Sequence, residues 1–200
     1  MKKSFLQRRR FLLCLGLGVA GTAVFGSRWQ QIPSKVAFGN VVPKGISPPS
    51  QPLVVLGGKP LPEFEGISAW LNSEPLTIAD LKGSVVLVQF WTLGCINCLR
   101  TLPYMARWHR QYAAQGLKVV GIHTPEFAYE RDLNNIKKAI QQHQITYPVP
   151  VDNAFKTWNA YSNQYWPHLF LADRQGLIRY DHIGEGAYDT TEQTIRKLLG

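Results

Sequence analysis

Residues 85–98 of this 200-residue chain read VVLVQFWTLGCINC, and they decide the fold. The first seven, residues 85–91, are almost all β-branched or apolar, which is typical of a strand buried on both faces in a parallel sheet. This run leads directly into two cysteines, Cys95 and Cys98. Apolar residues then recur at helical spacing until Gly116, and glycine often ends a helix. The stretch therefore predicts a strand, a C-x-x-C pair and a helix in immediate succession.

The segments around this unit predict the other elements. Residues 117–122 form a second buried run, which completes a right-handed strand–helix–strand crossover. The patterns further predict a helix over 130–143, a strand at 147–151, a short helix at 154–161, a hairpin of 168–172 with 177–183, and a last helix at 190–199. This order matches the thioredoxin-like α/β fold, βαβ then ββα around a central mixed sheet, with an inserted helical segment between the halves. Residues 67–71 and 76–78 flank a turn-like stretch, so we also expect an N-terminal hairpin extension.

Residues 1–26 have the composition of a targeting segment. They begin with basic residues and continue as an apolar run of about 22 Å in helical form, shorter than the roughly 30 Å core of a bilayer. Within them, RRRFL at residues 8–12 resembles the twin-arginine export motif. We expect an export signal or an N-terminal anchor in residues 1–26, a Pro/Gly-rich linker in 27–63 and a folded domain in 64–200. The expected location is the periplasm or an equivalent extracytoplasmic compartment.

More than half of the formal net charge of +9 comes from this targeting segment. Without its five basic residues, 17 basic residues face 13 acidic ones. No dense Lys/Arg stripe follows, so the sequence predicts no nucleic-acid partner. Of the three cysteines, Cys14 lies in the apolar run of the segment. The other two are three positions apart, and so short a loop favours redox chemistry over a structural cross-link.

The spacing of Cys95 and Cys98 suits disulfide exchange. A helix N-terminus stabilises an anion, so Cys95 is the expected thiolate nucleophile and Cys98, one turn inside the helix, the expected resolving cysteine. A zinc site would need a further Cys or His pair at short spacing, which the five histidines do not form. Two thiolates and one histidine, for which His168 is the best candidate, suit copper. A copper-binding module therefore stays open as an alternative.

Four further motifs give the chain a specific resemblance. FWTLGCINC at 90–98, GIHTPEF at 121–127, YWP at 165–167 and GEGAY at 184–188 resemble segments of the thioredoxin-like (redoxin) domain of DipZ/TlpA-type thiol–disulfide interchange proteins. The resemblance implies that Pro167 is a cis-proline facing the cysteines, and that Trp91 and Trp166 line the substrate-binding site. It implies protein thiols and disulfides as partners. The redox-active Cys95–Cys98 disulfide then stands in place of any cofactor.

One position departs from the pattern. Thioredoxin has a buried aspartate six residues before the first cysteine, whereas this chain has Gln89, which does not titrate. Glu126 follows the run 117–122, and the loops after parallel strands gather at one edge of a sheet. We therefore expect Glu126 to assist deprotonation of Cys98.

The sequence thus predicts an extracytoplasmic thiol–disulfide oxidoreductase, expected as a monomer. The dipeptide Ile96-Asn97 carries no charge that would stabilise a thiolate, which favours a reductant supplied by a separate membrane-bound electron donor. A thiol peroxidase is a second alternative, although Leu93-Gly94-Cys95 lacks the Pro/Thr-rich loop of peroxiredoxins.

Overall fold

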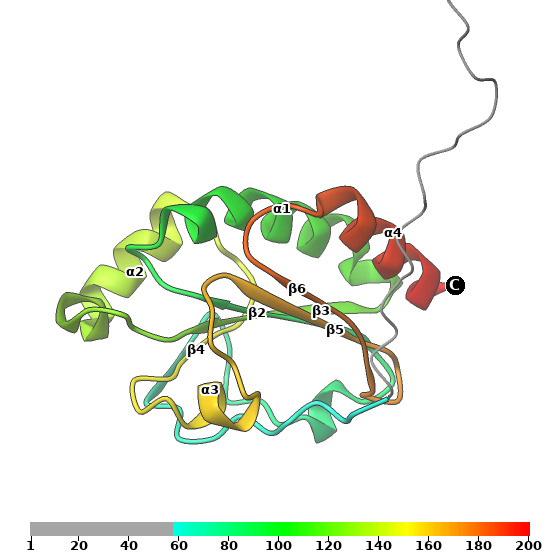
Figure 1. Cartoon of the computed structure of the whole chain (residues 1–200), viewed down its shortest axis with the longest axis horizontal. Coiled ribbons are helices and arrows are strands. Elements are labelled where there is room, and N and C mark those ends of the chain that lie inside the picture. The colour runs from blue at the N-terminus through cyan, green and yellow to red at the C-terminus, as the bar shows by residue number, and fades with distance from the viewer. Residues whose placement is uncertain (1–57) are drawn as a thin grey trace, which may run out of the picture. The chain divides into compact units, whose positions relative to one another are not determined.

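The computed structural model describes residues 58–200, which form a six-stranded sheet with helices on both faces (Figure 1). The strands are β1 (Ala69–Leu71), β2 (Val85–Trp91), β3 (Leu117–His123), β4 (Val149–Val151), β5 (His168–Ala172) and β6 (Ile178–Ile183). The helices are α1 (Ile96–Tyr112), α2 (Leu133–Gln142), α3 (Lys156–Ala160) and α4 (Tyr188–Leu199), with short 3-10 turns η1 (Ala79–Leu81), η2 (Ala113–Gln115) and η3 (Ala128–Arg131). The strand order is β1-β4-β3-β2-β5-β6.

Strand β2 lies in the interior of the sheet, and all seven of its residues are buried. It pairs in parallel with β3 and antiparallel with β5, so the sheet is mixed. Its side chains alternate between two cores: Leu87 packs on the side of α1, α2 and α4, and Val88 on the side of α3. Figure 1 shows the same division of the helices. The thioredoxin-like α/β fold is confirmed, with the cysteine pair directly after β2.

The expected N-terminal hairpin is wrong. Residues 69–71 form β1, but this strand pairs antiparallel with β4, with Ala69 opposite Val151. Residues 76–78 form no strand, because carboxylates take their backbone donors: Thr77 N–H donates to Asp80 (2.8 Å) and Ile78 N–H donates to Glu63 (3.0 Å). The outer edge of β4 offered unpaired backbone groups that a local hairpin would have left exposed.

The folded part begins before Phe64, the boundary that the sequence indicates. Pro60 forms a β-bridge with Leu177, the residue just before β6. Leu61 is only 5% exposed and belongs to the core on the α3 side. Residues 58–63, expected as linker, therefore pack against the domain.

The expected targeting segment, residues 1–26, and linker residues 27–57 lie outside the described residues. Between residues 58 and 200, no helix combines the length and apolar character needed to cross a membrane.

A charged cluster fastens α4 to α1. The Glu192 carboxylate accepts hydrogen bonds from Tyr112 (2.7 Å) and Trp108 (3.2 Å) of α1. Arg107 of α1 and Arg196 of α4 each approach it at 2.8 Å. The hydrogen bond from Arg196, reinforced by those from Tyr112 and Trp108, lowers the pKa of Glu192 to about 2. The ionised carboxylate is therefore the form that holds the two helices together.

We expect Glu192→Gln to destabilise the domain by about 2 kcal/mol at pH 7, since hydrogen bonds to a charged group are worth about 1.5–3 kcal/mol. Because the folded pKa is lowered, this stabilisation is present above pH 4.5 and is lost as the pH falls through about 2. Urea unfolding of both chains at pH 7 and near pH 2 measures the effect. Glu185→Gln, which breaks the exposed pair with Arg100, is the control and should change stability by less than about 0.5 kcal/mol. An equal loss at both pH values would show that the charge is not responsible.

Candidate active site

The cysteine pair lies where β2 passes into α1. Cys95 is the N-cap residue of α1, and its sulfur accepts a 3.2 Å hydrogen bond from the Cys98 N–H. The two cysteines are joined as a disulfide, with their Cα atoms 5.2 Å apart. Cys95 is half-buried and Cys98 is fully buried. In the reduced pair, the helix N-terminus thus stabilises an anion on the accessible sulfur, and the second sulfur is shielded.

Pro167 lies just before β5, and its peptide bond with Trp166 is cis, which confirms that expectation. Strand β5 runs antiparallel to β2, with His168 opposite Phe90. The Pro167 carbonyl accepts a 2.8 Å hydrogen bond from the Gly184 N–H, which ties it to the end of β6. Pro167 and the cysteine pair therefore share one edge of the sheet.

The two tryptophans expected at the substrate site differ in exposure. Trp166 is half-buried, and its indole N–H donates to the Thr124 carbonyl at 3.0 Å. Trp91 is 0% exposed, its indole N–H donates to the Gly121 carbonyl at 3.1 Å, and its ring meets His123 edge-on at 5.1 Å. The expectation that Trp91 contacts substrate is therefore wrong: Trp91 is a buried residue of the same hydrophobic core that contains Cys98.

The acid that bonds to the active-site loop is Glu130 and not Glu126. The Glu126 side chain is exposed and accepts no hydrogen bond from the residues described. Glu130, on η3, is 0% exposed and accepts hydrogen bonds from the N–H groups of Gly94 (2.8 Å), Glu126 (2.6 Å) and Phe127 (2.8 Å). Gly94 is the residue immediately before Cys95. The buried acid thus reaches the cysteine loop from the segment that follows β3.

Sequence reasoning missed Glu130, although a signal was present. A glutamate three residues after the residue that opens a helical turn is the acidic half of a capping box, and Glu130 holds that position relative to Phe127. The sequence gives no sign that the same carboxylate also receives the Gly94 N–H, 36 positions away along the chain. Gln89 stands where thioredoxin has its buried aspartate. It is fully buried, and neither its amide oxygen nor its amide nitrogen has a hydrogen-bond partner among residues 58–200.

The charge of this buried cluster is negative. Burial alone would raise the pKa of Glu130, but hydrogen bonds from Phe127, Thr92, Glu126 and Gly94 outweigh it and hold that pKa below its ordinary value. Burial lowers the pKa of the neighbouring His123 to about 4, so this imidazole is neutral at pH 7. Glu130 therefore stays ionised, and His123 does not neutralise it.

His168, the histidine considered for copper, is occupied by other partners. Its Nδ1 lies 2.6 Å from the Asn163 side-chain oxygen and its Nε2 lies 2.9 Å from the Asp181 carboxylate. The same Asn163 oxygen accepts the Gln164 N–H at 2.9 Å, which fixes the turn before the cis-proline. Neither nitrogen is directed at the cysteines, so His168 supports the shape of the loop. No cluster of three or more metal-ligating side chains occurs in the described part of the chain.

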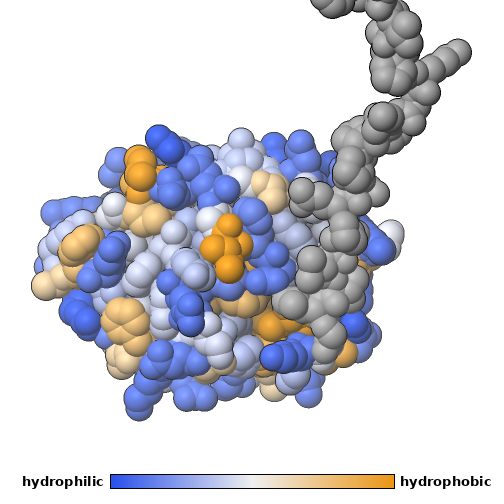
Figure 2. Space-filling model, in the orientation of Figure 1, coloured by the Kyte–Doolittle hydropathy of each residue, from blue (hydrophilic) through white to orange (hydrophobic). Residues whose placement is uncertain are grey.

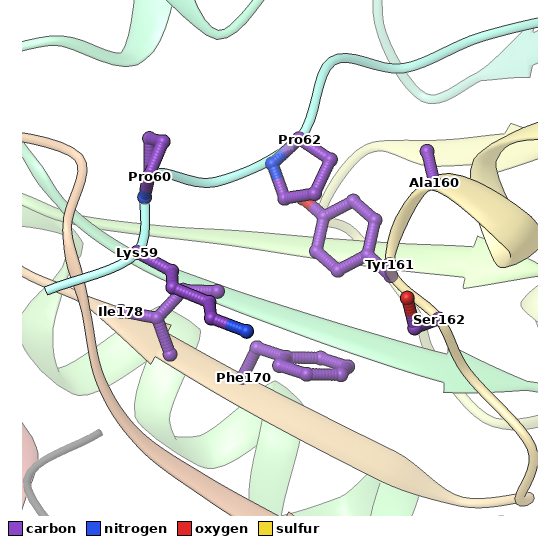
Figure 3. A pocket seen from close by; sticks show the side chains of 8 residues that line it. All are labelled: Lys59, Pro60, Pro62, Ala160, Tyr161, Ser162, Phe170 and Ile178. Carbon is purple, nitrogen blue, oxygen red and sulfur yellow. The ribbon is translucent and has the colours of Figure 1, made fainter. Parts of the chain in front are cut away.

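A separate hollow of about 370 Å³ lies on the α3 side of the sheet (Figure 3). Its lining includes four apolar side chains, Pro60, Pro62, Phe170 and Ile178, together with Lys59 and Ser162. It contains none of the sequence-predicted site residues, and it forms where the segment before β1 crosses the sheet. The hollow is therefore not part of the cysteine site.

A family model and several known proteins are similar to this chain over the same part of its sequence. Residues 58–181 match the model of the AhpC/TSA family. The chain is 42% identical over 141 residues to Protein DipZ of Mycobacterium bovis, a match that covers 69% of this chain but 20% of DipZ. It is 29% identical over 141 residues to the thiol–disulfide oxidoreductase YkuV of Bacillus subtilis, covering 70% of this chain and 95% of YkuV.

A solved structure described as a thioredoxin-like protein in the oxidised form superimposes with a TM-score of 0.66 at 30% identity. That match covers 71% of this chain and 95% of the solved one. The chain spans about a fifth of the length of the DipZ proteins it matches. The family match covers residues 58–181, well over half of the chain, and the chain therefore belongs to the AhpC/TSA family with a thioredoxin-like fold.

Proposed function

We propose that this chain is a thiol–disulfide oxidoreductase that exchanges disulfides with polypeptides outside the cytoplasm. The observation that carries the proposal is the unequal burial of the pair: Cys95 is accessible at the N-terminus of α1, and Cys98 is buried one turn later. A structural disulfide needs no such asymmetry, whereas an exchange enzyme needs one sulfur that meets the substrate and one that resolves the adduct.

The reaction follows from this asymmetry. In the reduced protein, the Cys95 thiolate attacks one sulfur of a substrate disulfide, forms a mixed disulfide and releases the other substrate sulfur as a thiolate. Deprotonated Cys98 then attacks the Cys95 sulfur, which releases the second substrate thiolate and leaves the Cys95–Cys98 disulfide. Two electrons pass from the cysteine pair to the substrate, and the two released substrate thiolates take up the two protons.

A polypeptide substrate fits the surface around the pair. Figure 2 shows a face that is mostly hydrophilic, with apolar side chains in small separate patches. Among residues 58–200 the exposed large hydrophobic residues are Ile96, Phe127, Tyr129, Leu133, Tyr165 and Ile183. They belong to segments next to the ends of β2, β3 and β6 and the start of β5, the edge that carries the cysteines. Phe127 and Tyr129 stack at 6.1 Å with their rings nearly parallel.

The direction of electron flow, the donor and the location are parts of the same proposal. The uncharged Ile96-Asn97 dipeptide supplies no charge that would stabilise a Cys95 thiolate, which suits a reductant. A reductant outside the cytoplasm needs electrons from a membrane-bound donor, and the twin-arginine-like segment supports export. We expect the protein to act as a monomer, with the cysteine pair as its redox group and Trp166 and Pro167 beside the bound substrate.

The test is the reduction potential of the Cys95–Cys98 couple. The full chain is equilibrated against glutathione buffers of known potential, and its free thiols are counted by alkylation and mass spectrometry. We expect a reversible two-electron couple nearer to about −270 mV than to about −120 mV, the range of known thioredoxin-fold reductants and oxidants. A couple near the upper value would reverse the direction of flow. The absence of a reversible couple would overturn the proposal. Copper titration of the dithiol would then test the copper-binding alternative, and peroxide consumption would test the peroxidase alternative.

A further inference from the structure

Glu130 is a buried acid that the exchange reaction itself does not use. Its carboxylate bonds to the Gly94 N–H at 2.8 Å through one oxygen, and to the Glu126 and Phe127 N–H groups through the other. It thereby joins the segment after β3 to the loop between β2 and α1. Cys95 is the residue that directly follows Gly94 in the sequence.

The Glu130 carboxylate packs closely against the backbone of Gly94. A Cβ atom placed on Gly94 would lie 2.5 Å from the Glu130 Oε1 atom and in contact with the Tyr129 hydroxyl. Real Cβ atoms do not approach so closely, so a side chain at position 94 would displace the carboxylate. The absence of a side chain at Gly94 is therefore what lets Glu130 reach the backbone beside the nucleophile.

The charge of Glu130 is uncompensated by the groups that face it. On β3, burial keeps His123 neutral. On η3, Tyr129 stays protonated, because desolvation of its hydroxyl and the charge of the Glu130 carboxylate raise the pKa of that hydroxyl, although much of the ring is exposed. The loop after β2 contributes only the neutral Thr92 hydroxyl and the Gly94 N–H. No ion pair in the described part of the chain includes Glu130.

A fixed negative charge beside a cysteine opposes formation of its thiolate, and in this fold the stability of that thiolate governs the potential. DsbA is a strong oxidant because its reduced form is stabilised, with a thiolate pKa of about 3.5. Glu130 acts in the opposite direction to the helix N-terminus at Cys95. The ionised carboxylate therefore raises the free energy of the reduced pair relative to the disulfide.

The geometry points to Glu130 as a positioning residue that holds the loop before Cys95 in place and, through its charge, makes the cysteine pair a stronger reductant. This inference rests on the proposed exchange function. It concerns Glu130 rather than Glu126, and its role differs from the one expected for Glu126, because it concerns the potential of the pair and not removal of the Cys98 proton.

The test compares three variants of the full chain. Glu130→Gln removes the charge, Glu130→Asp keeps it on a shorter side chain, and Glu126→Gln removes an exposed acid of the same loop. Each is equilibrated with glutathione, and the rate of Cys95 alkylation is followed from pH 4 to pH 9. We expect Glu130→Gln to shift the equilibrium about tenfold toward the dithiol, which is about 30 mV for a two-electron couple. Its alkylation profile should move to lower pH.

Both Glu130→Asp and Glu126→Gln should keep an equilibrium constant within about threefold of the unchanged chain, equal to about 15 mV. Equal shifts in the Gln and Asp variants would mean that packing alone is responsible and would overturn the inference. An unchanged Glu130→Gln couple would overturn it as well, while the intact couple of the parent chain would leave the exchange function standing. If Glu130→Gln does not fold, the Asp variant decides, since a tenfold shift there contradicts the charge mechanism.

Discussion

Replacing Cys95 with serine should lower disulfide-exchange activity to the background of a cysteine-free chain, a loss of about 10³-fold or more. The reason is chemical: a hydroxyl at the N-cap of α1 is not ionised at neutral pH and does not attack a disulfide. Reduction of a disulfide-containing polypeptide by glutathione, with catalytic amounts of the variant, measures the loss. Cys14→Ser is introduced into every chain, so that the pair supplies the only thiols.

The matched Cys98→Ser variant should fail at a different step. Its Cys95 still attacks, but nothing resolves the adduct, so a mixed disulfide with the substrate accumulates. Mass spectrometry after acid quenching should place this adduct on Cys95, and Cys95→Ser should form none. An adduct on Cys98 in the Cys95→Ser chain would contradict the burial of that sulfur, which is 0% exposed. Turnover by Cys95→Ser would contradict the assignment of the nucleophile.

The parts of the fold that the sequence predicted are those with strong local patterns. The apolar run of β2, the C-x-x-C spacing and the repeat of α1 each lie within a short window and agree with one another. The predicted hairpin is wrong because its first segment, residues 67–71, forms a strand over only residues 69–71, too few to specify a partner. Its pairing depended on the free edge of β4, about 80 positions later along the chain, as the Ala69–Val151 register shows.

In the candidate site too, local motifs predict some residues, and the others depend on the tertiary structure. The positions of Cys95, Cys98 and Pro167 at one edge of the sheet could be predicted from motifs, because each motif has a fixed place in the fold. Glu126 and Glu130 are both acids in one short segment, and only the tertiary arrangement buries one and exposes the other. An argument from chain position and sheet topology selects Glu126, the acid nearer to the end of β3. In the structure, the acid that bonds to the cysteine loop is Glu130, whose carboxylate accepts hydrogen bonds from three backbone N–H groups.

The same contrast between local and tertiary requirements applies to Gly121 in β3. A Cβ atom there would lie 2.7 Å from the Tyr147 ring and 3.2 Å from the Trp91 Nε1 atom. Tyr147 and Trp91 are both 0% exposed, so neither side chain has room to move aside. The Trp91 indole also donates to the Gly121 carbonyl at 3.1 Å. Gly121 has no room for a side chain because the Tyr147 and Trp91 rings pack against it.

We expect Gly121→Ala to destabilise the domain by about 3 kcal/mol, the upper part of the range for overpacked cores. Alanine also lowers the entropy of the unfolded chain, which stabilises the folded state by only about 0.4–1 kcal/mol. The steric clash is therefore the larger effect. For a domain of this size the melting temperature should fall by roughly 10 °C. Exchange activity measured below that temperature should also fall, because the displaced Trp91 belongs to the core that buries Cys98.

Gly176→Ala is the matched control, because it separates steric clash from backbone strain. Gly176 has φ +80° and no atom within 4 Å of a Cβ placed on it. An alanine there meets only the cost of the left-handed conformation, about 1–2 kcal/mol, in a turn between β5 and β6 far from the cysteines. It should lower the melting temperature less than Gly121→Ala and leave the exchange rate unchanged. Equal effects of the two variants on activity would mean that the packing of Trp91 against Gly121 does not govern the position of the cysteine pair.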